Sequence, residues 1–509
     1  MPESYIKKIL GARVYDVAIE SPVDPARLLS KRLENHVLLK REDLQEVFSF
    51  KLRGAYNKMA SLSQSERDQG VVAASAGNHA QGLALAAQKM KVKATIVMPK
   101  TTPAIKVDAV RSRGAKVVLH GDTFDEASKL ARELVVEKGM VYVHPFDDPE
   151  VIAGQGTIGV EILRQVSGDL DAIFLPVGGG GLAAGVAAYV RYVRPDIKIF
   201  AVEAEDSACL KAAMDAGERV VLEHVGIFAE GVAVAQIGEE TFRVIRQTID
   251  GVITCNTDEM CAAIKDIFDD TRSIAEPSGA LALAGLKKYV AETGVKDKTL
   301  LAIASGANSN FDRLRYISER TEIGEQREAV LSVCIPEKPG SFKKFCAALG
   351  RRAITEFNYR MGDPKDAQIY VGVQVVPGGE DRLQLVEMLR EKDYLVTDLT
   401  DDEMAKLHIR HMVGGPAPAS IQNECVYRFE FPERPGALLN FLTTLGNRWN
   451  ISMFHYRNHG AAYGRVLVGM EVPENERKEL ENYLTELNYP FINETNSVAY
   501  RQFLAPRKA

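Results

Sequence analysis

Two stretches in the last third of the chain repeat one another, and this internal repeat is the strongest single constraint on the fold. VCIPEKPGSF at 333–342 matches RFEFPERPGAL at 428–438, and ITEFNYR at 354–360 matches ISMFHYR at 451–457. The offset is 96 residues at Pro339/Pro435 and 97 at the second pair of motifs. Each copy has the pattern strand, turn, helix, strand, strand, helix, strand, which predicts two small α+β domains.

The repeat defines the domain organisation that we expect. We place the two repeated domains at 329–401 and 424–495, and a linker rich in glycine, proline and alanine at 402–423. Residues 1–325 instead alternate short runs rich in valine and isoleucine with longer segments of helical spacing, which is typical of an α/β domain with parallel sheet. The strands expected there are 71–75, 93–98, 116–120, 171–177, 198–203 and 299–305.

Composition excludes several classes of protein. A chain of 509 residues is too long for one hydrophobic core, so several compact units are expected. The net charge of −6 carries no long run of one sign, so neither a nucleic acid nor a membrane surface is an expected partner. No segment has the length of uninterrupted apolar sequence that spans a bilayer. The six cysteines form no CxxC pair and are expected to be reduced, in a cytoplasmic protein.

The segment SFKLRGA at 49–55 offers the clearest reactive group. Lys51 lies between an aromatic ring and the start of a predicted helix. A desolvated lysine amine condenses with a carbonyl to form a Schiff base, the link that pyridoxal phosphate enzymes use. Considered alone, such a lysine is more often an ordinary solvated helix residue.

Two further loops follow predicted strands, where ligands gather in open parallel sheets. Ser75, Ala76, Gly77, Asn78 and His79 lead from strand 71–75 into a helix, a turn that suits a carboxylate or phosphate, or an ordinary turn with an asparagine cap.

The second loop holds Gly178, Gly179, Gly180 and Gly181, followed by Leu182. Four consecutive glycines have a large entropic cost, and their unhindered N–H groups at a helix start suit a phosphate. The same loop fits GxGxxA with Glu203 after the next strand, so a dinucleotide-binding reading stays open.

Two polar features are weaker. Ser305 ends the strand 299–305 and could bond a ring nitrogen or cap a helix. His408 and His411 lie one helical turn apart, but without a third ligand beside them a polar face is favoured over a metal site.

These motifs carry a resemblance over nearly the whole chain. SFKLRGA, SAGNHAQG, GGGGLAAG and SGAN, in this order, resemble the pyridoxal phosphate enzymes of the tryptophan synthase β family, and the repeat resembles paired ACT-like amino-acid-sensing domains. Together they resemble the threonine ammonia-lyases. The implied fold class is α/β, a fold type II pyridoxal phosphate enzyme of two open twisted αβα subdomains, followed by two α+β ACT-like (ferredoxin-like) regulatory domains.

The resemblance also implies roles for individual residues. Lys51 is the matching position for the catalytic lysine, and the loop 75–79 for the substrate carboxylate. The matching cofactor-binding positions are Phe50, Lys51, Asn78, Gly178, Gly179, Gly180, Gly181, Leu182 and Ser305. Tyr359 and Tyr456 match each other in the two repeats and are expected effector positions.

The implied activity is dehydration and deamination of L-threonine, and also of L-serine, to a keto acid and ammonia at the first step of isoleucine synthesis. Isoleucine is the implied inhibitor, valine the opposing effector, and a homotetramer the implied assembly. Racemases of similar fold carry a serine at the position of Ala76, so racemisation is disfavoured. They bind a divalent cation beside the position of Glu203, but Ser207 and Cys209 do not offer matching ligands, so no essential metal is expected.

Two alternatives of other classes remain open. An NAD-dependent oxidoreductase would use the glycine loop and Glu203, but would leave SFKLRGA and SGAN unexplained. An amino-acid sensor without catalysis would bind isoleucine and form no keto acid.

Overall fold

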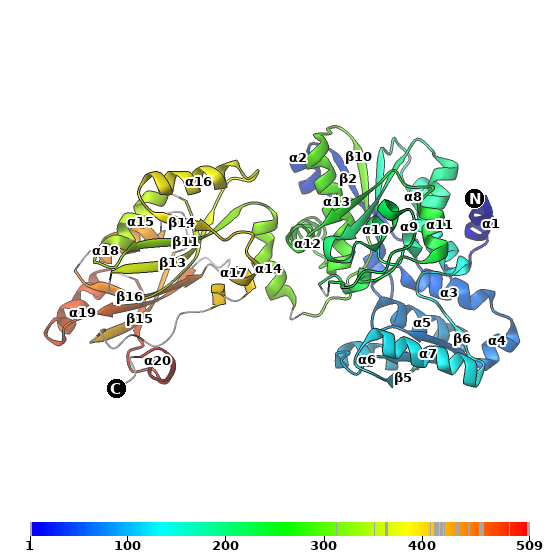
Figure 1. The fold of residues 1–509 in the computed structure, drawn as a ribbon, viewed down its shortest axis with the longest axis horizontal. Helices are drawn as coiled ribbons and strands as arrows, with labels where there is room; N and C mark the ends of the chain where they lie inside the picture. The colour runs from blue at the N-terminus through cyan, green and yellow to red at the C-terminus, as the bar shows by residue number, and fades with distance from the viewer. Residues whose placement is uncertain are drawn as a thin grey trace. The chain divides into compact units, whose positions relative to one another are not determined.

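The computed structural model describes residues 3–505 apart from 227, 312, 351, 362–364, 408, 412–416, 418–420, 422, 433–436, 446–447, 458–462 and 488. The chain forms two compact units, Met1–Gly324 and Glu325–Ala509 (Figure 1). His408, most of the linker 412–420 and the second PxxPG turn at 433–436 lie outside the described residues. None of the helices in the described part of the chain is long and apolar enough to cross a membrane.

The larger sheet of the first unit has six strands. Its order is β1 (Val23–Pro25), β2 (His36–Arg41), β10 (Thr299–Ala304), β7 (Ala172–Pro176), β8 (Lys198–Ala204) and β9 (Gly251–Cys255). All neighbours are parallel except β1 and β2, whose antiparallel pairing the sequence pattern does not predict.

The smaller sheet of the first unit has four parallel strands. Its order is β5 (Lys116–Leu119), β4 (Ala94–Met98), β3 (Val71–Ala74) and β6 (Val141–Tyr142). The six strands predicted from the sequence are therefore confirmed to within one residue at either end, and the predicted pair of α/β subdomains corresponds to these two sheets.

Helices cover both faces of the large sheet because its central strands are apolar on both sides. Along β7, Ile173 and Leu175 join one hydrophobic cluster, and Ala172 and Phe174 join the cluster on the opposite face. The principal helices of the unit are α3 (Lys51–Ser61), α5 (Asn78–Met90), α6 (Ala104–Arg111), α7 (Phe124–Lys138), α8 (Pro149–Gln165), α9 (Gly181–Val193), α10 (Cys209–Ala216), α11 (Glu239–Ile245), α12 (Thr257–Thr271), α13 (Pro277–Thr293) and α14 (Arg313–Gly324).

The second unit is built on one eight-stranded antiparallel sheet. Its order is β14 (Leu395–Asp398), β11 (Glu328–Pro336), β13 (Asp366–Gln374), β12 (Ile354–Arg360), β16 (Asn450–Arg457), β17 (Tyr463–Glu471), β15 (Glu424–Pro432) and β18 (Phe491–Asn493). Its helices are α15 (Ser341–Leu349), α16 (Glu380–Glu391), α17 (Glu403–Leu407), α18 (Ala437–Leu445), α19 (Arg477–Glu486) and α20 (Val498–Phe503). Each copy thus has the element order that the repeat predicts.

The two copies meet where β12 pairs with β16. Phe357 lies opposite Tyr456 and Tyr359 lies opposite Phe454 in the antiparallel register. All four side chains are buried, and the rings of Phe357 and Phe454 meet edge to face at 5.3 Å. The two phenylalanines thus belong to one core that the repeats share.

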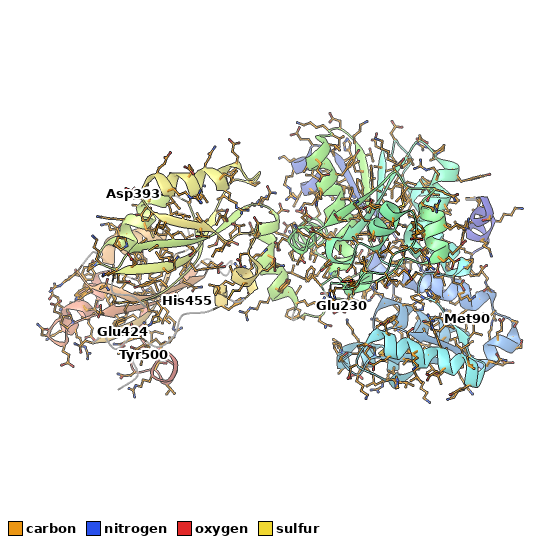
Figure 2. The ribbon with its side chains drawn as sticks, in the orientation of Figure 1. Met90, Glu230, Asp393, Glu424, His455 and Tyr500 are labelled. Atoms are coloured by element: carbon orange, nitrogen blue, oxygen red, sulfur yellow. The ribbon has the colours of Figure 1, made fainter. Side chains whose placement is uncertain are left out.

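The matching buried glutamates of the two copies each accept a hydrogen bond from the hydroxyl at one repeat position, Ser452 or Thr355, but they differ in their other partners. Glu424 on β15 binds Arg360 at 2.6 Å and accepts a hydrogen bond from Tyr500 in α20, also at 2.6 Å (Figure 2). Its counterpart Glu328 on β11 accepts a hydrogen bond from Thr355 and lies 3.8 Å from Arg410, which is also buried. In the second copy, the C-terminal helix α20 therefore contacts Glu424 through Tyr500. In the first copy, the segment that follows β14 places Arg410 beside Glu328.

Candidate active site

Lys51 is the first residue of α3, and its side chain lies in the wall of a pocket. Its Nζ donates to the carbonyl oxygen of Gly231 at 3.3 Å, and no other hydrogen bond of this amine is found among the described residues. Burial lowers the pKa of Lys51, and the negative charge of Glu276 only partly opposes that shift. A weakly solvated amine with a lowered pKa is suited to condensation with a carbonyl.

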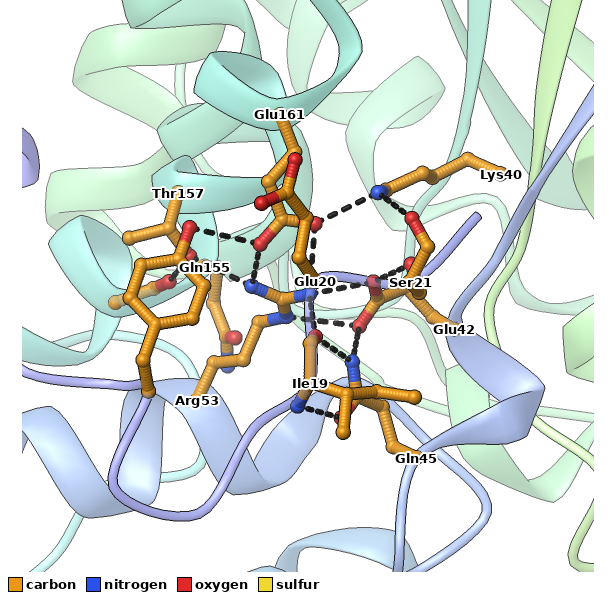
Figure 3. A network of polar contacts seen from close by, with 12 residues as sticks. Ile19, Glu20, Ser21, Lys40, Glu42, Gln45, Arg53, Gln155, Thr157 and Glu161 are labelled. Atoms are coloured by element: carbon orange, nitrogen blue, oxygen red, sulfur yellow. Dashed lines mark hydrogen bonds and ion pairs between the residues drawn. The ribbon is translucent and has the colours of Figure 1, made fainter. Parts of the chain in front are cut away.

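The helix that carries Lys51 is anchored by a buried network of four charged side chains (Figure 3). Arg53, two residues along α3, binds Glu42 at 2.8 Å and Glu161 of α8 at 2.5 Å, and Lys40 binds Glu161 at 2.6 Å. All four side chains are completely buried. Two positive and two negative charges balance, so the network fixes the start of α3 between β2 and α8 without leaving a net buried charge.

Every residue predicted to bind the cofactor lines a single pocket. The predicted residues in its wall are Phe50, Lys51, Asn78, Gly178, Gly179, Gly180, Gly181, Leu182 and Ser305. The sequence reasoning missed the other lining residues, which are Pro145, Phe146, Gln155, Pro176, Gly231, Val232, Val234, Glu276 and Ser278. Of the missed residues, only Glu276 is charged.

The glycine loop lines this pocket and leaves little room for side chains. Gly180, which precedes α9, has a φ of +89°, and a Cβ on Gly179 would lie 2.2 Å from the ring of Phe146. Thr241 donates to the carbonyl oxygen of Gly179 at 2.7 Å and so fixes the loop. The loop N–H groups precede a helix start and suit a phosphate, so this cradle and the Lys51 amine fit a phosphorylated aldehyde.

Asn78 does not cap its helix, which corrects the ordinary reading of this turn. The N-cap of α5 is Gly77, and no side chain caps it. The Asn78 amide instead donates from Nδ2 to Glu276 at 2.6 Å and accepts at Oδ1 from Asn308 at 2.7 Å. Asn78 is thus turned into the pocket by residues that are far away in the sequence.

The rest of the loop 75–79 lies outside the pocket wall. The N–H of Gly77 donates to the Ser75 hydroxyl at 3.3 Å, which tightens the turn beside Ala76. His79 is buried, its Nε2 lies 2.9 Å from the carbonyl oxygen of Val143, and burial lowers the pKa of His79 to about 3. The imidazole is therefore neutral at physiological pH.

Ser305 also departs from a helix cap. Its hydroxyl donates to the carbonyl oxygen of Ser278 at 3.2 Å, at the start of α13, and lines the pocket. In this geometry the hydroxyl can accept a hydrogen bond, and it can donate one to a ring nitrogen if its O–H turns away from the carbonyl of Ser278.

The structure argues against the dinucleotide-binding interpretation, because the carboxylate of Glu203 is already bound by backbone N–H groups. The carboxylate of Glu203 accepts from the N–H groups of Leu210 and Lys211 at 2.7 and 2.8 Å, at the start of α10. Burial raises the pKa of Glu203 to about 7. Glu203 therefore serves a helix N-terminus and not a ribose.

The predicted effector positions in the second unit are buried. Tyr359 donates its hydroxyl to Glu337, which also accepts from Asn450 at 3.0 Å, and Tyr456 lies in the same hydrophobic core. A ligand could reach Tyr359 only by displacing part of this packing.

Comparison with known proteins is consistent with this geometry. Residues 15–306 match the family model described as pyridoxal-phosphate dependent enzyme, and residues 319–409 and 415–504 match the C-terminal regulatory domain of threonine dehydratase. The biosynthetic L-threonine dehydratase of Burkholderia multivorans is 55% identical over 504 residues, covering 98% of this chain and 99% of the relative. That of Escherichia coli is 56% identical over 501 residues, covering 98% and 97%.

Solved structures match about three fifths of the chain. The processed form of threonine deaminase isoform 2 from Solanum lycopersicum is 52% identical, with a TM-score of 0.62 over 63% of this chain and 93% of that one. Serine racemase from Dictyostelium discoideum is 33% identical, with a TM-score of 0.56 over 60% and 99%.

Proposed function

Since the chain belongs to the biosynthetic threonine dehydratases, which are pyridoxal-phosphate-dependent lyases, we propose that it converts L-threonine to 2-oxobutanoate and ammonia. In this proposal Lys51 carries the cofactor. The observation that carries this proposal is the single pocket in which Lys51, the glycine loop, Asn78 and Ser305 converge. The four motifs are far apart in the sequence, so their convergence is evidence that they serve one ligand.

Lys51 is the proposed base. When bound, pyridoxal phosphate withdraws electrons from the substrate α-carbon and so acidifies its α-proton. Because burial lowers the pKa of Lys51, a larger fraction of its amine is neutral and able to take that proton. With the cofactor bound, the net reaction would remove water from threonine, and the released enamine would tautomerise to an imine that one water hydrolyses to the keto acid and ammonium.

The other pocket residues hold the reactants. We assign the N–H groups of the glycine loop to the phosphate, Phe50 to the face of the ring, Asn78 to its 3-hydroxyl and Ser305 to its nitrogen. Ser305 is uncharged and cannot hold the ring nitrogen protonated as a carboxylate would, which favours rapid β-elimination over a long-lived carbanion.

We assign the substrate carboxylate to the loop 75–79, whose N–H groups lie at the start of α5. L-serine fits the same chemistry, because it differs from threonine by one methyl group, worth about 1–3 kcal/mol in a pocket. Ala76 has no side-chain hydroxyl to return a proton to the α-carbon, which argues against racemisation.

The second unit is the proposed regulatory part. We propose isoleucine as inhibitor and valine as opposing effector, with Tyr359 and Tyr456 near the effector positions, in a homotetrameric enzyme of isoleucine synthesis. The proposed boundaries remain 1–325 for the catalytic part, 329–401 and 424–495 for the regulatory repeats, and 402–423 for the linker. A cytoplasmic location, also proposed, is testable by cell fractionation.

The test is keto-acid release from threonine and from serine, with and without isoleucine and valine, for the wild type and Lys51→Ala. We expect rapid release by the wild type, none by the variant, and a borohydride-stable adduct on Lys51 in the wild type only. Persistent activity of Lys51→Ala would reject the assigned base. Isoleucine binding without any keto acid would identify a sensor that has lost catalysis.

A further inference from the structure

A carboxylate that no motif of the sequence indicates lies in the wall of the active-site pocket. Glu276 precedes α13 and is only 7% exposed. It lines both this pocket and the adjoining cavity bounded by Lys106, Glu230 and Arg313. A buried carboxylate in a site built for an anionic cofactor needs a reason to be there, since it repels the phosphate and has lost its hydration.

The first reason lies in the hydrogen bonds of Glu276. Its Oε1 accepts from Asn78 at 2.6 Å and from Ser278 at 2.7 Å, and among the described residues Oε2 has no hydrogen-bond partner. Asn308 donates to the opposite end of the Asn78 amide at 2.7 Å and is itself held by the carbonyl oxygen of Val47 at 2.8 Å.

This chain of contacts fixes which end of the Asn78 amide is the donor. Rotating the amide by 180° would set its oxygen against the carboxylate of Glu276 and its N–H groups against those of Asn308, so two hydrogen bonds would become two repulsions. Nδ2 keeps one N–H that Glu276 does not use. Asn78 is therefore presented as a hydrogen-bond donor, which is the polarity that a negatively charged oxygen on a ligand requires.

The second reason is charge. Two other ionisable groups interact electrostatically with Lys51, namely Glu276 at the start of α13 and His79 on α5, and His79 is neutral. The carboxylate of Glu276 is thus the single negative charge in the pocket wall within the described residues. An opposite charge nearby favours the protonated form of a nitrogen.

We propose that Glu276 is a positioning residue of the active site, which orients the Asn78 amide as a donor and stabilises the protonated state of the Lys51 nitrogen. The inference rests on the proposed function, because it concerns the lysine that carries the cofactor. It explains why a carboxylate is retained between Asn78 and Ser278 at a cost in desolvation. Glu276 acts indirectly. It orients Asn78 by a hydrogen bond, and its negative charge favours the protonated Lys51 nitrogen.

The experiment is a pH titration of the visible absorbance of the cofactor-loaded enzyme, which reports protonation of the Lys51 nitrogen. Glu276→Gln keeps an acceptor for Asn78 but removes the charge, and Asn308→Ala removes the other anchor of Asn78 but keeps the charge. Glu230→Gln is the matched control, because it removes a carboxylate from the adjoining cavity alone.

We expect Glu276→Gln to move the spectral midpoint down by about one pH unit or more, and Asn308→Ala and Glu230→Gln to leave it unchanged. We also expect Asn308→Ala to weaken cofactor binding at constant pH, because it frees the Asn78 amide to rotate. A midpoint of Glu276→Gln within the error of the wild type would overturn the inference. If the wild type shows no cofactor absorbance and no adduct on Lys51, the proposed function itself fails, which is a different result.

Discussion

The buried network around Arg53 allows a quantitative test, because its four charges sum to zero. Lys40→Met leaves Arg53 facing both Glu42 and Glu161, with one negative charge uncompensated in a completely buried site. Removing one partner of a buried ion pair costs about 3–5 kcal/mol. Glu161→Gln should cost a similar amount, because it leaves a positive charge uncompensated and replaces one of the two carboxylate oxygens that accept from Arg53 and Lys40 with an N–H donor.

The double variant Lys40→Met, Glu161→Gln restores neutrality. Arg53 and Glu42 remain as an intact pair, joined by two hydrogen bonds of 2.8 Å. The cost of the double change should therefore fall short of the sum of the single costs by about 2–3 kcal/mol, the upper range of coupling between contacting residues.

The two units can be followed separately during urea unfolding. Trp449 is the only tryptophan of the chain and belongs to the core of the second unit, so its fluorescence reports that unit, whereas far-ultraviolet circular dichroism reports both. The Lys40 and Glu161 variants should shift the unfolding transition of the first unit, seen by circular dichroism, and leave the fluorescence transition of the second unit unchanged. Lys296→Met, which breaks an exposed pair with Glu34, is the control and should leave both transitions in place.

The network also predicts a pH dependence. Burial alone would raise the pKa of Glu161, but Arg53 and Lys40 lower it. A carboxyl group with a lowered pKa stabilises the fold above its unfolded pKa, and this stability is lost as the pH falls through the folded value. Glu161→Gln should therefore flatten the acid limb of the stability curve. Additive costs in the double variant, within about 0.5 kcal/mol, would refute the network as a coupled unit.

Three further changes have defined outcomes. Gly179→Ala should weaken cofactor binding tenfold or more, worth about 1.4 kcal/mol, because the new Cβ meets Phe146, and adding Phe146→Ala should recover part of the affinity in equilibrium dialysis. His79 has a pKa lowered by burial from 6.5 to about 3, so stability should fall as the pH drops between these values by up to about 1.4 kcal/mol per pH unit, and less steeply in His79→Gln, measured as thermal midpoints. Phe357→Ala should destabilise the second unit by about 3–5 kcal/mol, seen as an earlier Trp449 transition; an unchanged transition would show that β12 and β16 do not share a core.

The sequence predicted the part of the site that lies in short contiguous motifs. Lys51, the glycine loop, Asn78 and Ser305 each directly follow a strand or begin a helix, so residue type and position together indicate a ligand site. The fold class is confirmed for the same reason, since strand and helix periodicities are local.

The missed residues depend on contacts between distant segments. Glu276 followed by Pro277 reads as an ordinary helix start, and only the fold brings it to Asn78, 198 residues earlier. Arg53 reads as a surface helix residue, and it is buried only because Glu161, 108 residues away, meets it. For the glycine loop, the four consecutive glycines in the sequence indicate a bulky neighbour. They do not identify that neighbour as Phe146.

The two repeats differ in the residues that surround their matching buried glutamates. Glu328 and Glu424 occupy the same position of the repeat. Arg410 lies 3.8 Å from Glu328, whereas Arg360 and Tyr500 bind Glu424. Two copies with the same surroundings would respond to one ligand at one concentration. The two copies instead present different charges and hydrogen-bonding groups at one position of the repeat, which two identical domains related by symmetry cannot do.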